Sequence, residues 1–354
     1  MKVVKTKDAV GRILCHDITQ IIPGQKKGPV FKKGHVVQAE DIPVLLSVGK
    51  ENLYVWENEK GILHENDAAK ILRDLCMGNS DMMEASEPSE GKIEIRAAKK
   101  GLLKIDSKRL LKLNSLGQMM LATIRGNIVV NAGDKIAGTR IIPLAIEEKK
   151  MRHARRIVGK EPLLRILPFS PKKVGLVTTG SEIKKGLIKD SFGGVVKSKL
   201  LEFGAEVVGQ TFPGDEAQAI KSDILSFADG GADIVLCTGG MSVDPDDRTP
   251  AAIRASGAKI VSYGAPVLPG AMFLLSYLRR GKKRVPVLGL PGCVMYAART
   301  VFDLVLPRLL CGEKIRAKDL NALGEGGLCL GCAECRFPNC GFGANSGAYR
   351  SEYE

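Results

Sequence analysis

Residues 173–182 of the chain read K-V-G-L-V-T-T-G-S-E, and residues 233–242 read D-I-V-L-C-T-G-G-M-S. In each stretch a short apolar run ends in threonine and passes directly into a loop that contains glycine. Short runs rich in Val, Ile and Leu that are bounded by turn residues are typical of buried strands. The two stretches therefore predict two buried strands whose carboxyl ends open into glycine loops.

Strand and helix patterns alternate on both sides of these stretches. Further strands are expected at 207–211, 259–261, 272–278 and 284–288, and helices at 191–203, 215–228, 249–255 and 294–310. Alternation of this kind predicts βαβ units. The expected fold class is α/β, a doubly wound and mostly parallel sheet spanning residues 172–312.

The remaining parts of the chain have a different texture. Residues 1–146 predict a β-rich α+β region, and residues 313–354 form a Cys-rich tail. Between the first region and the predicted sheet domain, residues 147–171 begin with E-E-K-K-M-R-H-A-R-R. This segment predicts a basic linker helix in contact with solvent. A nucleic-acid-binding arm is the less favoured interpretation of this charge run.

Composition restricts the class of protein. The 354 residues are 44% apolar and 26% charged, which is ordinary globular composition and excludes a mostly disordered chain. No apolar run approaches the roughly 20 residues of a membrane span, and the first residues show no signal peptide, so a cytoplasmic protein without membrane contact is expected. A formal net charge of +14 favours anionic partners, with a solubilising basic surface as the alternative. Aromatic residues are only 5% of the chain, which argues against a nucleic-acid partner.

Four loops at predicted strand ends or turns would let a ligand approach the backbone closely. They are Thr178–Glu182, Thr238–Ser242, Leu268–Gly270 and Gly289–Gly292. Ligands bind at the carboxyl ends of strands in open α/β sheets, and glycine lets backbone N–H groups face an anion. The four loops together predict a phosphate site.

Acidic residues accompany these loops. Residues 244–249 read D-P-D-D-R-T, and carboxylates beside a phosphate imply a divalent cation or a proton transfer. The alternative is that Asp247 or Thr249 caps the next helix. The same two interpretations apply to Asp190 with Ser191 and to Asp215, and for Asp215 the cap is favoured.

In this order the loops resemble the molybdopterin-binding domain shared by the molybdotransferase family (bacterial MoeA, gephyrin) and the Mog and MoaB proteins. The resemblance covers residues 172–310, and segments 9–14, 30–34, 40–42 and 46–49 are also similar to the molybdotransferases. It implies that the domain binds molybdopterin, and that the protein hydrolyses adenylated molybdopterin while inserting molybdate, with Mg²⁺ as cofactor.

Site residues follow from this resemblance position by position. Asp247 and Asp190 are expected to be catalytic, and Glu182 and Asp247 are expected to hold magnesium. The expected contacts to the pterin and its phosphate are Thr179, Gly180, Ser181, Glu182, Ser191, Gly239, Gly240, Ser242, Pro269, Gly270, Pro291, Gly292 and Cys293.

The chain departs from the molybdotransferase pattern at several of these loops. Ser181 stands in place of an acid, Phe192 in place of an asparagine and Ala271 in place of a lysine. Two other functions therefore stay open: a carrier or sensor of the molybdenum cofactor, and a nucleotide pyrophosphatase like the CinA-type proteins, which the D-D-R-T stretch resembles. The expected partners are molybdopterin or its adenylated form, a molybdenum enzyme, and further copies of the same chain.

The tail carries a separate signal in the spacing C-x2-C-x2-C-x4-C, formed by Cys329, Cys332, Cys335 and Cys340. Four thiolates can close a tetrahedral zinc site or hold an iron–sulfur cluster. The spacing is not cleanly that of zinc fingers or of ferredoxins, so zinc and an iron–sulfur cluster both remain candidates, with four free thiols as the alternative.

Overall fold

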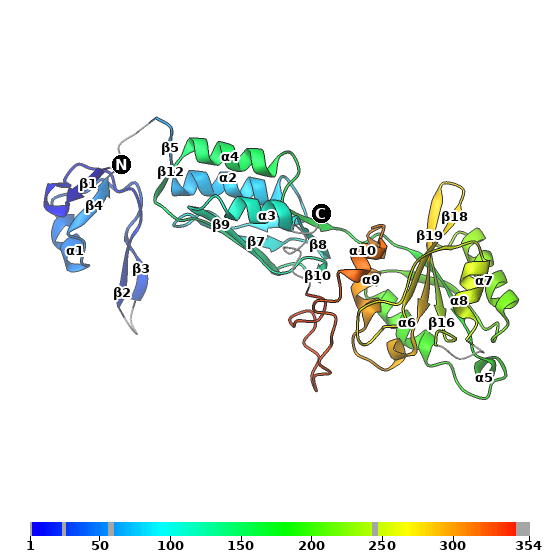
Figure 1. Ribbon diagram of the computed structural model, residues 1–354. Helices are drawn as coiled ribbons and strands as arrows, with labels where there is room; N and C mark the ends of the chain where they lie inside the picture. Colours follow the sequence, from blue (N-terminus) through cyan, green and yellow to red (C-terminus); the bar gives the residue numbers. More distant parts are fainter. Residues whose placement is uncertain (1, 23–25, 56–59, 243–246, 345–354) are drawn as a thin grey trace. The chain divides into compact units, whose positions relative to one another are not determined.

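The computed structural model describes residues 2–22, 26–55, 60–242 and 247–344 (Figure 1). The chain divides into two compact units. The first comprises residues 1–99, 105–124 and 131–165, and the second comprises residues 100–104, 125–130 and 166–354. The acids Asp244 and Asp246 of the D-P-D-D-R-T stretch lie outside the described residues.

The amino-terminal part of the first unit is built from short strands around a small apolar core. Strand β1 (Lys2–Lys5) pairs antiparallel with β4 (Asn52–Val55), and β2 (Ile18–Ile22) pairs antiparallel with β3 (Lys26–Phe31). A short 3₁₀ helix, η1 (Thr6–Asp8), and helix α1 (Asp41–Ser47) complete this part. Leu14, Leu45 and Leu53 are almost fully buried in its core.

The rest of the first unit is a four-stranded antiparallel sheet in the order β6-β7-β11-β9, with helices on one face (Figure 1). The strands are β6 (Met83–Ala85), β7 (Lys92–Ala97), β9 (Met119–Thr123) and β11 (Lys135–Ile141), and a small pair is formed by β5 (Ile62–His64) and β12 (Ala145–Glu147). The helices are α2 (Glu65–Met77), α3 (Ser107–Asn114) and α4 (Glu148–Val158).

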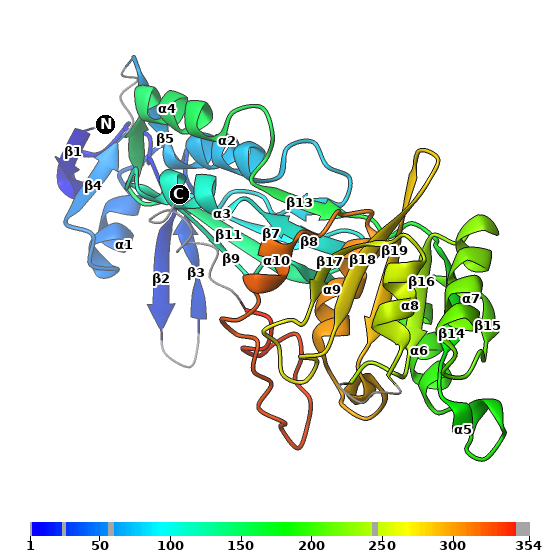
Figure 2. The same cartoon turned by 45° about the vertical axis from the view of Figure 1, so that its right-hand side comes forward.

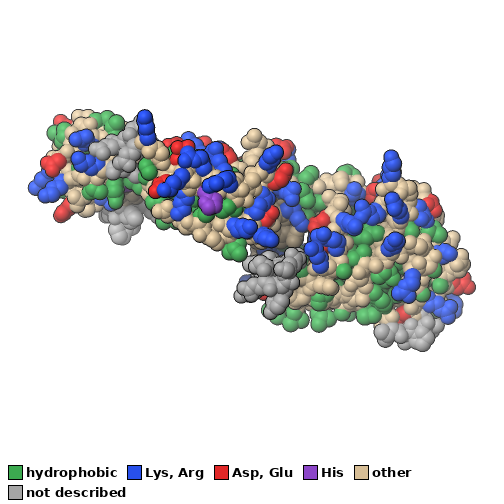
Figure 3. Space-filling view, turned by 45° about the horizontal axis from the view of Figure 1, so that its top comes forward, with side chains coloured by type: hydrophobic (Ala, Val, Ile, Leu, Met, Phe, Trp, Pro, Cys, Tyr) green, Lys and Arg blue, Asp and Glu red, His purple; other side chains and the backbone are tan. Residues whose placement is uncertain are grey.

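The predicted solvated linker helix is found as α4, but it is an integral part of the first unit. Met151, Ala154 and Val158 are buried, and α4 packs against α2 and α3. Its basic side chains stay outside, where Lys and Arg gather on the face that carries α2 and α4 (Figure 3). The helix therefore belongs to the first unit and does not stand between two domains, because an apolar stripe, which the charge run obscured, packs against α2 and α3.

The second unit contains a six-stranded sheet in the order β15-β14-β16-β19-β18-β17. Its strands are β14 (Lys173–Thr178), β15 (Glu206–Thr211), β16 (Ile234–Thr238), β17 (Lys259–Tyr263), β18 (Leu274–Arg280) and β19 (Lys283–Leu290). Strands β15, β14, β16 and β19 run parallel to one another, whereas β18 is antiparallel to both of its neighbours. The prediction of a sheet with parallel strands is confirmed.

Helices cover both faces of this sheet (Figure 2). Alternate residues of a strand point to opposite faces, and accordingly Leu176 of β14 joins one core cluster and Val177 the other. The first cluster includes α6 (Phe192–Leu201) and α9 (Val301–Leu310), and the second includes α7 (Ala217–Asp229) and α8 (Thr249–Ala255). A sheet buried on both faces explains why its strands are continuous apolar runs.

One predicted helix is shorter than expected. The expected helix over 294–310 is divided into a 3₁₀ turn, η2 (Gly292–Met295), and α9, which begins at Val301. Thr300 is extended and forms a capping box with Asp303, whose carboxylate accepts from the Thr300 backbone N–H at 2.8 Å. The prediction was wrong at this end because a Thr-x-x-Asp cap starts a new helix there.

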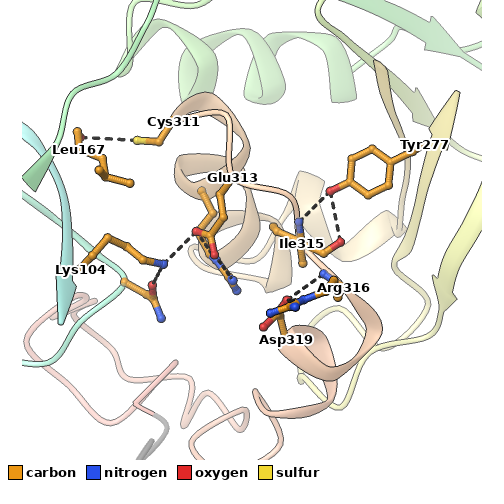
Figure 4. A network of polar contacts seen from close by, with 10 residues as sticks. Lys104, Leu167, Tyr277, Cys311, Glu313, Ile315, Arg316 and Asp319 are labelled. Atoms are coloured by element: carbon orange, nitrogen blue, oxygen red, sulfur yellow. Dashed lines mark hydrogen bonds and ion pairs between the residues drawn. The ribbon is translucent and has the colours of Figure 1, made fainter. Parts of the chain in front are cut away.

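A polar network fixes the segment that follows α9 (Figure 4). The carboxylate of Glu313 accepts from Arg308 at 2.6 Å and from Lys104 at 2.9 Å. Lys104 lies in β8 (Gly101–Ile105), the central strand of a three-stranded sheet with β10 (Ile128–Val130) and β13 (Leu164–Leu167). The hydroxyl of Tyr277 in β18 accepts from the backbone N–H of Ile315 at 2.9 Å, just before α10 (Ala317–Asn321). No helix in the described part of the chain is long and apolar enough to cross a membrane.

Candidate functional site

The strand register brings the four predicted loops to one edge of the six-stranded sheet. Thr178 pairs with Thr238, and Thr238 pairs with Leu290, so the three parallel strands end level with one another. Because β18 runs the other way, the Leu268–Gly270 loop that precedes it reaches the same edge, where Leu274 pairs with Gly289. The sequence-based expectation that the loops share one edge therefore holds.

A pocket of about 870 Å³ opens at this edge, above β14 and β16. Strand β14 has β15 as its neighbour on one side and β16 on the other, so the chain reverses direction across the sheet at β14. The pocket therefore lies at the topological switch point of the sheet. Of the predicted site residues, those that line the pocket are Thr179, Gly180, Ser181, Glu182, Asp190, Ser191, Gly239, Gly240 and Asp247.

The floor of the pocket is a set of buried threonine hydroxyls. The Oγ1 of Thr179 donates to the carbonyl of Thr238 at 3.1 Å, and the Oγ1 of Thr249 donates to the carbonyl of Gly239 at 3.0 Å. Thr238 donates in turn to the Oγ1 of Thr178 at 3.2 Å. Buried polar groups that satisfy one another hold a single geometry, so these bonds fix the two loops in place.

Glycine is required at two positions on this floor. Gly239 has a φ of +86°, and a Cβ there would lie 2.8 Å from the carbonyl oxygen of Thr179. Gly240 has a φ of +57°, and a Cβ there would lie 2.7 Å from the Oγ1 of Thr249. Both positions combine a left-handed backbone with close approach to a neighbouring loop, which is why the second loop reads Gly-Gly.

The first loop is held by an acid from the next βα connection. The backbone N–H of Ser181, at the start of the short helix α5 (Ser181–Lys184), donates to the Oδ2 of Asp215 at 2.7 Å. The helix-cap interpretation favoured for Asp215 is wrong: α7 begins at Ala217, and Asp215 lines the pocket. Next to Ser181, Glu182 is exposed, and its carboxylate lies over Gly180. A Cβ added to Gly180 would be 3.4 Å from that carboxylate.

Asp190 is engaged by the start of helix α6. Its Oδ1 accepts from the backbone N–H of Phe192 at 2.9 Å, and both oxygens lie 3.1 Å from the N–H of Gly193. The Nε2 of Gln210 donates to its Oδ2 at 2.6 Å. The α6 terminus therefore already has an anion, and Asp190 holds the pocket wall in place rather than offering a free carboxylate.

Asp247 stands at the opposite side of the second loop. It is half-buried and lines the pocket. Burial and the negative charge of Asp247 together raise the pKa of Tyr263. The Tyr263 hydroxyl donates to the carbonyl of Met241 at 3.1 Å, and a Cβ on Gly289 would lie 2.4 Å from the Met241 sulfur. These contacts anchor the loop that carries Asp247.

Six predicted contact residues are absent from the described lining of this pocket: Ser242, Pro269, Gly270, Pro291, Gly292 and Cys293. A Cβ on Gly270 would lie 2.6 Å from Val301, so this glycine allows the loop to pack on α9. From the last loop the lining residue is Met295. Cys293 is half-buried, and burial raises the pKa of its thiol.

Sequence reasoning missed Gln210 and Tyr263. Gln210 bridges Thr178 and Asp190, and Tyr263 supports Met241. Each residue lies in the last part of its strand, at the edge where the pocket opens. The available signal was a polar side chain at the carboxyl end of a strand, the same position that drew attention to the threonines.

The charges in the pocket are mainly negative. Glu182, Asp190, Asp215 and Asp247 line it, and Lys189 is the one basic residue among the described lining residues. Asp190 and Asp215 accept hydrogen bonds from backbone N–H groups. Glu182 and Asp247, the two acids predicted to hold magnesium, line the same pocket. An anionic ligand would enter such a pocket together with a cation, since bare anions repel.

The tail cysteines lie at a second cavity of about 450 Å³ in the same unit, and Pro269 lines this cavity too. All four thiol residues contribute to its lining. Within the described ranges, no group of three or more His, Cys, Asp or Glu side chains is arranged to hold a metal ion. The predicted zinc or iron–sulfur site at these four cysteines stays a prediction.

Comparison with known families identifies two stretches. Residues 175–310 match the family described as a probable molybdopterin binding domain, and residues 3–57 match a family described as a domain of unknown function. The first match confirms the expected molybdopterin-binding domain at the level of the domain family. The match covers less than half of the chain, and it does not distinguish a molybdotransferase from other proteins with this domain.

Similar curated proteins are CinA-like. The CinA-like protein of Mycobacterium avium is 34% identical over 83 residues, and that of Mycolicibacterium gilvum is 34% identical over 77 residues. These matches cover 23% and 22% of this chain, and only 19% and 18% of the relatives. The chain thus spans about a fifth of the length of the curated relatives it matches.

Similar solved structures include two MoaB proteins. The tungsten cofactor synthesizing protein MoaB from Pyrococcus furiosus is 22% identical, with a TM-score of 0.31, and the match covers 35% of this chain and 84% of that one. The molybdopterin biosynthesis enzyme MoaB from Thermus thermophilus is 23% identical, with a TM-score of 0.32, and the match covers 40% of this chain and 98% of that one.

Proposed function

We propose that the pocket binds adenylated molybdopterin, and that the protein is a molybdotransferase that cleaves the phosphoanhydride and releases AMP as molybdate is inserted. The observation that carries the proposal is the placement of Glu182 and Asp247 in one pocket with the threonine and glycine floor formed by Thr179, Gly239 and Gly240. The domain-family match over residues 175–310 supports the ligand class.

The pocket suits a ligand with an anionic end and a flat polar ring system. Its volume of about 870 Å³ lies within the usual range for sites of small molecules and cofactors. The glycine floor gives a phosphate close access to the backbone, while Ile183, Ile188 and Met295 add apolar surface to the walls. Thr179 and Ser181 add hydroxyl groups for hydrogen bonds to the ligand.

Glu182 and Asp247 would hold Mg²⁺ in this site. Magnesium is commonly bound by one or two carboxylates together with substrate phosphates and water, so a set of three protein ligands is not required. When bound, the ion would neutralise phosphate charge and stabilise the charge that develops on the leaving group.

The other two carboxylates have positioning roles in the proposal. Asp215 holds the backbone of Ser181, and so the residue before Glu182, in place. Asp190 occupies the N-terminus of α6 and forms a charge-assisted contact with Gln210 at 2.6 Å. Because both accept hydrogen bonds from backbone N–H groups, they hold the wall of the pocket in place.

The experiment that tests the function uses the full chain purified without oxygen. The protein is mixed with adenylated molybdopterin, Mg²⁺ and molybdate, and AMP is measured over time. The proposal expects AMP release that depends on molybdate. Tight binding of the substrate without AMP would indicate a carrier or sensor of the cofactor, and AMP release that ignores molybdate would contradict the transferase assignment.

A nucleotide pyrophosphatase is the second candidate. The similarity to CinA-like proteins and the D-D-R-T stretch at 246–249 favour it. Both candidate reactions cleave a phosphoanhydride, so the same pocket would serve either one. A panel of dinucleotides, including NAD, separates the two candidates. Hydrolysis of these compounds at a rate above that of adenylated molybdopterin would favour the pyrophosphatase. Self-association and docking to a molybdenum enzyme remain predictions.

A further inference from the structure

Residues 326–343 of the tail form a closed loop next to α9 and α10 (Figure 2). Its base is tied on both sides: the N–H of Leu268 donates to the carbonyl of Gly327 at 2.8 Å, and the N–H of Gly343 donates to the carbonyl of Gly326 at 2.8 Å. Phe342 is buried in the core of the second unit, and Cys329 packs against that core. The four cysteines between these ties therefore belong to a segment held at both ends.

Two arginines flank an aromatic ring in this loop. The guanidinium carbons of Arg125 and Arg299 lie 5.5 Å and 5.2 Å from the ring centroid of Phe337. Arg125 donates to the carbonyl of Pro338 at 3.1 Å, and Arg299 pairs with Asp303 at 3.0 Å. Within the described residues, the buried Nε of Arg125 has no hydrogen-bond partner.

The same arginines lie close to two of the thiols. Arg299 forms a hydrogen bond with Cys335, and Arg125 lies within range of the charge of Cys340. Arg299 also lines the cavity that the four cysteines share. Positive charge therefore stands beside these cysteines.

A single ion and a cluster place different demands on four cysteines. A zinc ion with sulfur ligands at about 2.3 Å brings its four sulfurs to about 3.8 Å from one another. In an iron–sulfur cluster different thiolates bind different irons, so the thiolates stand farther apart around a shared space. All four cysteines line one cavity of about 450 Å³.

We infer that Cys329, Cys332, Cys335 and Cys340 hold a four-iron iron–sulfur cluster in this cavity, with Arg125 and Arg299 balancing its negative charge. The first three cysteines have the C-x2-C-x2-C spacing of the bacterial four-iron ferredoxins, and the fourth follows at a different distance. The apolar side chains of Leu328, Leu330 and Phe337 complete the lining of this cavity. The inference concerns a different cavity from the pterin pocket and does not rest on the proposed function.

The test is reconstitution of the full chain without oxygen, using ferrous iron, sulfide and a thiol reductant, followed by desalting. Iron and acid-labile sulfide are then measured with the visible absorption before and after dithionite. The inference expects about four irons and four sulfides per chain and an absorption that bleaches on reduction. Zinc bound one per chain without sulfide, two irons per chain, or no retained metal would each overturn it.

Variants keep the test specific to the tail. Cys332→Ser and Cys335→Ser are expected to lose most of the iron and sulfide. Cys311→Ser is the matched control, since Cys311 lies outside the cavity and its thiol contacts the carbonyl of Leu167. Circular dichroism and thermal unfolding of each variant show whether it folds. Full iron content in the tail variants, or equal loss in the Cys311 control, would contradict the assignment.

Discussion

The backbone N–H of Ser181 donates to the carboxylate of Asp215 across 2.7 Å, joining two loops that are 34 residues apart in sequence. This bond fixes the residue immediately before Glu182 and engages one oxygen of the Asp215 carboxylate. The shape of the first loop therefore depends on an acid from the next connection.

Replacement of Asp215 tests this relationship. Asp215→Ala is expected to weaken binding of molybdopterin about tenfold, since a hydrogen bond to a charged group contributes about 1.5 kcal/mol or more. Asp215→Asn keeps an acceptor oxygen and is expected to lose much less. Dissociation constants measured by fluorescence titration give the comparison. Equal losses in the two variants would show that charge, and not the contact with Ser181, matters.

Replacement of Asp247 tests the magnesium site. Asp247→Asn is expected to reduce AMP release at least about 100-fold, because removal of a group that stabilises developing charge has effects of this size. Asp229→Asn is the control, because Asp229 pairs with Arg280 near the opposite edge of the same sheet. Unchanged turnover in Asp247→Asn, with the control also active, would rule out the proposed role.

The glycine floor predicts a sharp difference between two similar substitutions. Gly240→Ala places a Cβ 2.7 Å from the Oγ1 of Thr249 at a φ of +57°, so about 1–3 kcal/mol of strain and weaker ligand binding are expected. Gly194→Ala, in α6, meets nothing within 4 Å and is expected to be neutral or stabilising. Denaturant unfolding and ligand titration measure both effects, and similar behaviour of the two variants would argue against a steric requirement at Gly240.

The Glu313 network predicts a pH dependence of stability (Figure 4). Burial alone would raise the pKa of Glu313, but hydrogen bonds and charge from Arg308 and Lys104 lower it overall. A carboxylate with a lowered pKa stabilises the folded state above its unfolded pKa, and this stabilisation is lost as pH falls through the folded value. The contribution should thus be full near neutral pH and decline below about pH 4.5.

Glu313→Gln is expected to cost about 2 kcal/mol at neutral pH, because it leaves the buried Arg308 without its partner charge. At acid pH the difference from the wild type should shrink. Denaturant unfolding at several pH values measures it. Glu94→Gln is a surface control that removes the partner of Arg96 and Lys135 and should cost less. A constant difference across the pH range would contradict the assigned role of Glu313.

The strands of the second unit were predictable because a sheet covered on both faces requires continuous apolar runs. Val174, Leu176 and Val177 are all almost fully buried, and the sequence shows them as one run. The boundary of α9 was missed because the decisive cap, Thr300 with Asp303, lies inside an otherwise helical pattern. The burial of α4 was missed because its charges outnumber the few residues that pack.

The sequence by itself determined the order of strands and loops, the glycines that permit close approach, and the acids available to the site. Only the tertiary structure decided which acids hold the pocket wall, because Asp190 and Asp215 are taken by N–H groups whose positions depend on how the strands and helices pack. It also separated Pro269 and the tail cysteines from the main pocket. The physical reason is that hydrogen bonds between distant segments depend on strand register, which is a property of the folded sheet and not of any local stretch.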